Sequence, residues 1–283
     1  MFNPVEGYVT TTNIRPVLSQ AEVDRFWTDG YLLVRGVLTK DEARHYGQLI
    51  LDLIPRDLSI PDHWQTNAGR IKPHFTPGND KYDGPEFIPL YQNEKLYNVM
   101  AQLLESPRLR VMDGSIGITM RNGASRDSEL SQTLHVDASV PRDADQFLFT
   151  LEEMQLGGCY YFTDVLPGGG GIHVVPGGPR IVEEEARADP RGRQLHHAWS
   201  RIHHLKSVEV TGEAGDFALL NHLMPHGASH NRRSTARLAQ FFRYVREDQS
   251  HGVGRRPVDG EYNQFQLAAM NPLGRKLLGV DPW

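Results

Sequence analysis

Two histidines and one aspartate are the clearest candidates for a metal-binding or catalytic site in this chain. His135 and Asp137 stand two positions apart, and His226 lies far downstream, directly before Gly227. On a β-strand, residues i and i+2 point to the same face, so one imidazole and one carboxylate can reach a common point. Two histidines and one carboxylate on one face of a metal leave three adjacent coordination positions open, the arrangement that suits Fe(II) in oxygen-activating enzymes.

An arginine provides the second part of the pattern. Arg237 follows His226 by 11 residues, within a strand-like run. A guanidinium can pair in a bidentate manner with the far carboxylate of an anionic chelator that occupies the open metal positions. Each feature alone has an ordinary structural explanation, such as a surface pair, a turn histidine or a salt-bridge partner. Their combination predicts metal-dependent oxygen chemistry.

The assignment of the distal histidine has competitors. His222 and His230 lie four residues to either side of His226, so all three share the same strand parity. Parity therefore does not choose among them. The glycine after His226 and the spacing to Arg237 favour His226.

The first hundred residues show mainly helical signals. These helices must help to position the histidines, the aspartate and the arginine. The segments 19–22 and 39–42 match the capping box, with Ser or Thr three residues before Glu. They predict one helix that Gly30 ends and another that runs to about residue 54, while apolar spacing predicts a third helix over 96–103. The segment 31–34 is typical of a strand.

From about residue 108 the pattern changes to short strands separated by glycine- and proline-rich turns. The expected strands are 108–120, 131–137, 146–152, 157–165, 171–176, 205–210, 216–223 and 236–245. This predicts a mainly β (α+β) fold of the sandwich, barrel or jelly-roll type. A charged run over 182–189 indicates a solvated helix. The long segment 55–92 is either a substrate-covering loop or a simple packing element.

Composition excludes several classes of function. The chain has 283 residues and a net charge of −5, without the basic patch of a nucleic-acid-binding protein. Its single cysteine, Cys159, excludes an intramolecular disulfide and any multi-cysteine metal site. No apolar run is long enough for a membrane span, and no signal peptide is visible. We therefore expect a cytoplasmic protein with a small-molecule substrate and neither nucleic acid nor membrane as partner; the oligomeric state stays open.

The full set of motifs resembles the phytanoyl-CoA dioxygenase family of Fe(II)/2-oxoglutarate-dependent oxygenases. The likeness includes residues 18–50, the His135-Val136-Asp137 motif, the glycine–strand–Pro-Gly segment at 170–178, Gly215-Asp216-Phe217, and the stretch from His226 to Arg237. It implies a double-stranded β-helix (jelly roll) flanked by helices. We expect a single domain, with a helical flank over 1–107, a jelly-roll core over 108–245 and a C-terminal tail over 246–283.

The resemblance also implies roles for individual residues. His135, Asp137 and His226 would bind Fe(II), and Arg237 would bind the C5 carboxylate of the cosubstrate 2-oxoglutarate. Thr119 and Gln132 stand where polar residues near the cosubstrate are expected. One departure is Ala228, where the family often has serine, and whether the hydroxyl of Ser229 replaces that contact is left open.

The activity implied by the resemblance is O₂-dependent oxidation of an unactivated C–H bond, with release of succinate and CO₂. An aspartate at position 137 disfavours a halogenase, which vacates that site for chloride. Tyr161 and Arg243 are candidates for the barrel interior; the alternatives are core packing for the aromatic residue and salt bridging for Arg243. They suggest a polar or cyclic substrate, such as a sugar unit of a natural product, with hydroxylation or oxidative cyclisation as outcome. The alternatives are a non-oxidative cupin-like metalloenzyme and a catalytically inactive metal-binding jelly roll.

Overall fold

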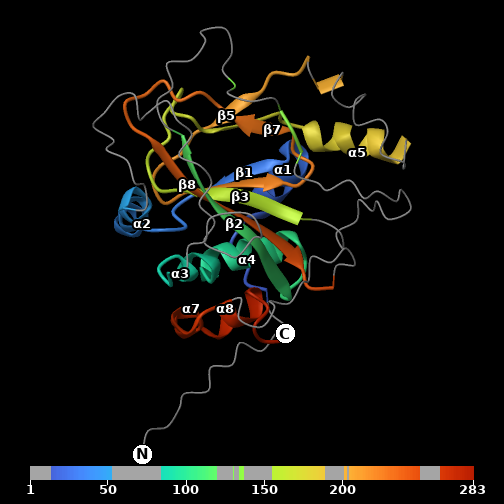
Figure 1. The fold of residues 1–283 in the computed structure, drawn as a ribbon. Coiled ribbons are helices and arrows are strands. Elements are labelled where there is room, and N and C mark those ends of the chain that lie inside the picture. Colours follow the sequence, from blue (N-terminus) through green and yellow to red (C-terminus); the bar gives the residue numbers. More distant parts are fainter. Residues whose placement is uncertain are drawn as a thin grey trace, which may run out of the picture.

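The computed structural model describes residues 14–52, 84–119, 130, 134–136, 155–188, 201–202, 204–248 and 262–283. The helices are α1 (Gln20–Asp29), α2 (Lys40–Asp52), α3 (Ile88–Tyr91), α4 (Glu94–Leu103), α5 (Gly178–Ala188), α7 (Gln264–Ala269) and α8 (Pro272–Leu277). The strands are β1 (Tyr31–Val34), β2 (Leu109–Thr119), β3 (Gln155–Tyr161), β4 (Ile172–Val174), β5 (Val208–Val210), β6 (Phe217–Asn221), β7 (His226–Ala228) and β8 (Arg237–Arg246). Two antiparallel sheets carry these strands (Figure 1).

Local signals set the N-terminal helices as predicted. Ser19 caps α1 and forms the reciprocal capping box with Glu22, and Gly30 ends the helix with a φ of 82°. Thr39 and Glu42 make the same exchange at the start of α2, where the Thr39 N–H donates to the Glu42 carboxylate over 2.7 Å. These bonds satisfy N–H groups that the first helical turn leaves without partners. The predicted helix over 96–103 is also confirmed, as part of α4.

The larger sheet has the strand order β1-β6-β3-β8-β2, and every neighbouring pair in it is antiparallel. β1 joins this sheet at one edge, where Tyr31–Val34 pairs with Phe217–Leu220 of β6. The sheet therefore includes a strand that precedes the expected core range 108–245. The predicted strand at 31–34 is confirmed, but its partner lies far away in the sequence.

The smaller sheet has the order β5-β4-β7 and packs against one face of the larger sheet. Apolar residues of both sheets form one cluster, which includes Ile172 and Val174 from β4 and Cys159 and Ala218 from β3 and β6. The Tyr161 hydroxyl donates to the carbonyl oxygen of Val210 over 2.8 Å and so ties the two sheets together. This two-sheet interior agrees with the sandwich, barrel or jelly-roll type that the sequence predicted.

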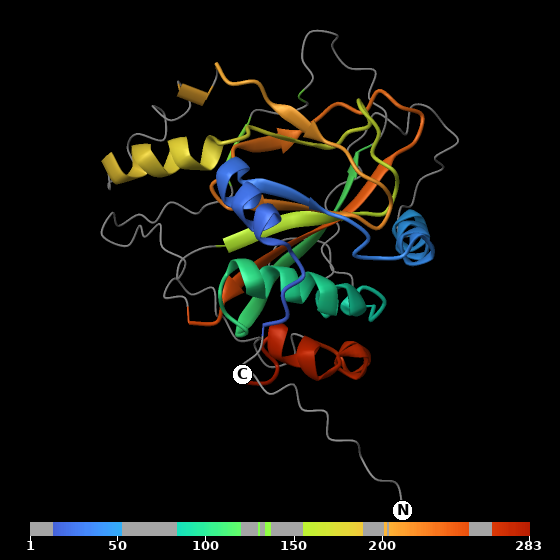
Figure 2. The ribbon, with the colours of Figure 1, turned by 180° about the vertical axis from the view of Figure 1, so that it is seen from behind.

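Helices cover the opposite face of the larger sheet. In both views α3, α4, α7 and α8 lie on the side away from β5 and β7 (Figures 1 and 2). Phe242 and Tyr160 from the sheet pack there with the helical layer, and the ring of Phe242 lies edge-on to Tyr91 with centroids 4.4 Å apart. The end of the expected loop 55–92 belongs to this layer, because Phe87 is 1% exposed and α3 follows it. The part of that loop over 53–83 lies outside the described residues.

The charged helix predicted over 182–189 appears as α5, which begins earlier, at Gly178. It is not solvated on every side, since Val182 is buried against Ile202 and Leu223. Arg201 forms ion pairs with Glu184 and Glu185 on the helix.

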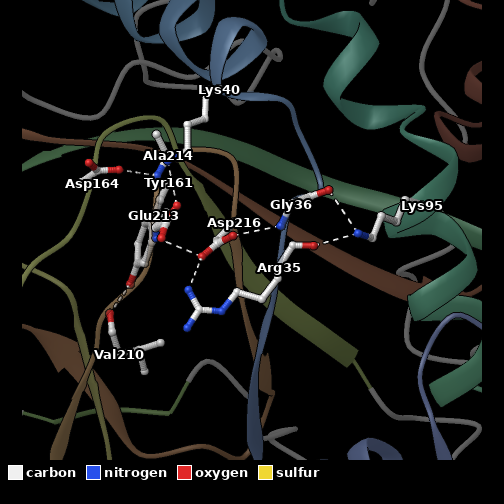
Figure 3. A network of polar contacts seen from close by, with 10 residues as sticks. All are labelled: Arg35, Gly36, Lys40, Lys95, Tyr161, Asp164, Val210, Glu213, Ala214 and Asp216. Carbon is white, nitrogen blue, oxygen red and sulfur yellow. Dashed lines mark hydrogen bonds and ion pairs between the residues drawn. The ribbon is translucent and has the colours of Figure 1, made fainter.

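A buried carboxylate, that of Asp216, connects the loop after β1 with the start of β6; this hydrogen-bond network is called the corner network below (Figure 3). Asp216 accepts hydrogen bonds of 2.9 Å from the backbone N–H groups of Gly36 and Glu213 and from the guanidinium of Arg35. The Leu38 N–H donates to the carbonyl of Gly215 over 2.9 Å beside this network. The loop after β1 is thereby held against the start of β6, which keeps the edge strand in register.

None of the helices that the structure describes combines the length and the apolar composition that a membrane span requires.

Candidate active site

His135 and His226 meet across an antiparallel bridge at the small sheet. The N–H of each residue donates to the carbonyl oxygen of the other, both over 2.8 Å. Directly opposed residues in antiparallel pairs project their side chains to the same face. The two imidazole rings accordingly lie side by side, with centroids 4.4 Å apart and a tilt of 45°. This contact selects His226 over His222 and His230 as the partner of His135.

The tautomer of His226 is set by the chain that precedes it. Its Nδ1 lies 2.9 Å from the carbonyl oxygen of Met224. A carbonyl only accepts, so Nδ1 carries the proton, and in the neutral ring Nε2 carries the lone pair. A histidine whose second ring nitrogen donates to a backbone carbonyl is oriented as metal-binding histidines are.

Arg237 begins β8 and is a buried cation, 4% exposed. Its guanidinium carbon lies 5.6 Å from the centroid of the Phe241 ring. Burial raises the pKa of the nearby Cys159 thiol to about 12, although the charge of Arg237 opposes that shift. Burial likewise raises the pKa of the Tyr161 phenol. Both groups therefore stay neutral at physiological pH and do not balance the guanidinium charge.

A pocket opens between the two sheets next to His226. It contains about 360 Å³ of empty space, its open mouth included. The lining comes from β3, β6 and β8 of the larger sheet and from His226 of the smaller sheet, and consists of Gln155, Gly157, Gly158, Leu220, Asn221, His222, His226, Phe241 and Arg243. Phe241 connects the two parts of the site, since its ring contacts Arg237 and also lines this pocket.

The described residues bring together part of the predicted set. His135, His226 and Arg237 are placed as above, and Thr119 of β2 pairs directly with Arg237 in the sheet register. Asp137 and Gln132 lie outside the described residues. Within the described part of the chain, no three His, Cys, Asp or Glu residues gather as a metal site. The two histidines are a donor pair that fits a third ligand from elsewhere.

The structure decides two questions that the sequence left open: the role of Ser229 and the places of Tyr161 and Arg243. The hydroxyl of Ser229 donates to the carbonyl of Gly171 and lies 3.1 Å from the Glu209 carboxylate, in a residue only 2% exposed. Ser229 is therefore engaged in holding the small sheet. Tyr161 does face the interior, but it is fully buried and bonded to Val210. Of the two interior candidates, Arg243 is the one that lines the pocket.

Sequence reasoning missed Gln155, Gly157, Asn221 and the pocket role of His222. One signal was available: the Gly157-Gly158 pair inside a predicted strand, since strand glycines often mark a close approach or a site kept open. The others carried no sequence signal.

A family comparison now identifies the fold. Residues 26–239 match the model of the family described as phytanoyl-CoA dioxygenase (PhyH). The chain belongs to the phytanoyl-CoA dioxygenase family. Enzymes of this family use Fe(II), 2-oxoglutarate and O₂. The family's cupin-like jelly roll agrees with the two facing antiparallel sheets, so the predicted fold class is confirmed. A comparison with curated protein sequences returned no match.

Solved structures of similar fold come from natural-product biosynthesis. The non-haem α-ketoglutarate-dependent carbocyclase SnoK from nogalamycin biosynthesis is 19% identical, with a TM-score of 0.58 over 87% of this chain and 95% of that one. The epimerase SnoN from the same pathway is 21% identical, with a TM-score of 0.54 over 80% of each chain. HygX from Streptomyces hygroscopicus, with nickel and 2-oxoglutarate bound, is 19% identical, with a TM-score of 0.55 over 88% of this chain and 94% of that one.

Proposed function

We propose that this protein is a non-haem Fe(II)/2-oxoglutarate-dependent dioxygenase that oxidises a C–H bond of a small polar or cyclic molecule. The outcome is hydroxylation or oxidative cyclisation, in the tailoring of a natural product. The observation that carries the proposal is the side-by-side placement of His135 and His226, of which His226 lines a pocket together with Phe241, the ring that contacts the buried Arg237.

The donor set suits the metal. The lone pair on Nε2 of His226 and the neighbouring imidazole of His135 supply two nitrogen ligands, and Asp137 would supply the carboxylate that completes a facial triad. When bound, Fe(II) with 2-oxoglutarate and O₂ supplies the oxidising power for C–H cleavage, and succinate and CO₂ are the coproducts. Met224 holds the His226 ring in its ligating orientation through its carbonyl.

Arg237 would anchor the C5 carboxylate of 2-oxoglutarate. A guanidinium in a site that excludes water forms stronger charge-assisted hydrogen bonds than an exposed one. The high pKa of Cys159 has a protective effect here, because a protonated thiol neither neutralises Arg237 nor competes as a thiolate ligand for the metal. Phe241 covers one side of the guanidinium and limits the positions that it can take.

Two observations support the substrate class. The first is the pocket beside His226, whose described lining includes the guanidinium of Arg243 and the amide side chain of Gln155. These groups favour a polar molecule over a long acyl chain. The second is the similarity in fold to SnoK and SnoN, a carbocyclase and an epimerase from nogalamycin biosynthesis, which are precedents for natural-product tailoring in this fold.

An anaerobic titration with Fe(II) and then 2-oxoglutarate tests the proposal. We expect the weak visible charge-transfer band of the metal–keto-acid chelate in the wild type and its loss in both His226→Ala and Arg237→Ala. The matched controls are His230→Ala, next in strand parity, and Arg232→Ala, which removes an exposed arginine, and both are expected to keep the band. Metal binding without any band in the wild type would contradict the proposal and favour the non-oxidative cupin-like alternative. Succinate release in a substrate screen would then follow a positive result.

A further inference from the structure

Two arginines lie on the same face of β8. Along this strand, Ala239 and Phe241 lie between Arg237 and Arg243, and alternate residues share a face. The register with the neighbouring strand β3 agrees with this alternation, since Gly157 pairs with Arg243 and Cys159 pairs with Phe241. The proposed binding of 2-oxoglutarate accounts for Arg237. Arg243 is a second interior cation, with no role so far.

Arg243 stands at the same pocket as His226. It comes from the larger sheet and His226 from the smaller one, so the pocket space lies between the guanidinium side chain and the proposed metal ligand. Its residue is half-buried, in contrast to the deeply buried Arg237. A ligand that enters the pocket therefore meets Arg243 without displacing the cosubstrate anchor.

Gly157 keeps the space beside Arg243 open. A Cβ atom at this position would lie 3.7 Å from Cγ of Arg243 and 3.6 Å from the carbonyl oxygen of Phe242. These are ordinary contact distances, so nothing in the backbone forbids a side chain there. A side chain longer than that of alanine would instead occupy the pocket next to the guanidinium stem.

The positive charge of the pocket lining comes from Arg243. Among the described residues of the lining, none is Asp or Glu. A guanidinium in such a lining suits oxygen atoms that carry negative charge.

We infer that Arg243 determines substrate specificity by binding an anionic oxygen group, a carboxylate or a phosphate ester, of the molecule to be oxidised. This inference rests on the proposed function and names the substrate class of that site. The anionic group is held by the β8 guanidinium, and the reacting carbon then lies toward His226. Gly157 provides the room for the ring or chain that joins the two.

Three sugars that differ only at C6 test the inference: D-glucose, D-glucuronate and D-glucose 6-phosphate. Binding is measured by calorimetry on the anaerobic Fe(II) protein with saturating 2-oxoglutarate, so that Arg237 is occupied. We expect one of the two anions to bind roughly tenfold or more tighter than glucose, as a charge-assisted pair implies. Which anion binds better distinguishes a carboxylate from a phosphate as the natural group.

Substitutions at Arg243 and Gly157 test whether these residues cause the preference for an anionic sugar. Arg243→Gln should reduce it to within about twofold of glucose, and Arg243→Lys should retain part of it. Gly157→Leu should weaken all three sugars, whereas Gly157→Ala should bind them nearly as the wild type does. Equal or undetectable binding of the three sugars by the wild type would overturn the inference. A preference that survives in Arg243→Gln would overturn it as well.

Two further measurements distinguish a failure of the role of Arg243 from a failure of the proposed function. The charge-transfer titration of Arg243→Gln should match that of the wild type, and a lost band in this variant would place Arg243 in the cosubstrate site and so overturn its role in specificity. If the wild type binds no 2-oxoglutarate, the proposed function fails, and the same sugars measured with Arg237→Ala still report on Arg243 alone.

Discussion

His135 and His226 exchange two backbone hydrogen bonds of 2.8 Å, and their imidazole centroids lie 4.4 Å apart. The bridge makes the separation of the rings a property of the backbone rather than of flexible side chains. A pair of ligands held in this way needs little reorganisation when a metal binds.

The histidine pair yields the first prediction. His135→Ala should lower the affinity for Fe(II), or for Co(II) as a spectroscopic substitute, by about 100-fold or more, because loss of a ligand costs at least as much as loss of an outer partner. Metal affinity is measured by competition with a chelator. His45→Ala is the control, since His45 is exposed on α2. Equal affinities in the two variants would contradict a role of His135 in metal binding.

Replacement of Arg237 by lysine tests the shape of the cosubstrate anchor. Lysine keeps the charge but offers no planar fork, so we expect the Kd of 2-oxoglutarate to rise roughly 10- to 100-fold while Fe(II) affinity stays the same. The exposed Arg232→Lys serves as control. An unchanged Kd in Arg237→Lys would show that charge alone, or another residue, binds the cosubstrate.

The two adjacent glycines of β3 should respond very differently to the same substitution. A Cβ at Gly158 would lie 2.0 Å from the carbonyl oxygen of Ala218, and its φ of 147° is unfavourable for other residues. Gly158→Ala should therefore lower the free energy of unfolding by more than about 3 kcal/mol. Gly157→Ala meets ordinary contacts and should cost less than about 1 kcal/mol. Urea unfolding measures both, and similar losses would contradict this reading of the strand.

The corner network contains a buried acceptor, Asp216, and an exposed donor, Arg35, which should contribute differently to stability. Asp216→Ala leaves the N–H groups of Gly36 and Glu213 without their acceptor and should cost about 2–4 kcal/mol of unfolding free energy. Arg35→Ala should cost less than about 1 kcal/mol, because the Arg35 side chain is 67% exposed. Chemical denaturation of the two variants compares these values. An equal loss in both would mean that the ion pair, and not the backbone bonds, holds the corner.

Alkaline pH should destabilise the fold through buried phenols. Burial, with a further contribution from Glu42, raises the pKa of Tyr46 to about 12 from its ordinary value of 10. The unfolded chain then releases the proton before the folded one does, so this stabilisation is complete below about pH 10 and is lost as the pH rises toward 12. Tyr46→Phe should lose about 1 kcal/mol less than the wild type between pH 8 and 11. Parallel losses in urea unfolding at the two pH values would contradict this assignment.

Elements with short-range signals were predictable from the sequence. The capping boxes at Ser19 and Thr39 are closed by residues three positions away, so their hydrogen bonds do not depend on the rest of the fold. The strands over 108–120 and 236–245 were visible as apolar runs, and β2 and β8 appear there. By contrast, β7 has three residues, too few to predict a strand from the sequence, and its strand hydrogen bonds come from pairing with β4.

The same distinction applies to the site. The sequence by itself determined the residue types, the spacing of His226 and Arg237, and hence the family and its chemistry. Strand parity did not distinguish His226 from His222 and His230, although the following glycine and the spacing to Arg237 favoured His226. The structure adds the bridge that pairs His226 with His135. Tertiary structure also decided that Arg243 reaches the pocket beside Gly157 while Tyr161 fills the core. These outcomes depend on register and sheet packing between segments far apart in the chain, where the free energy comes from contacts that no local pattern encodes.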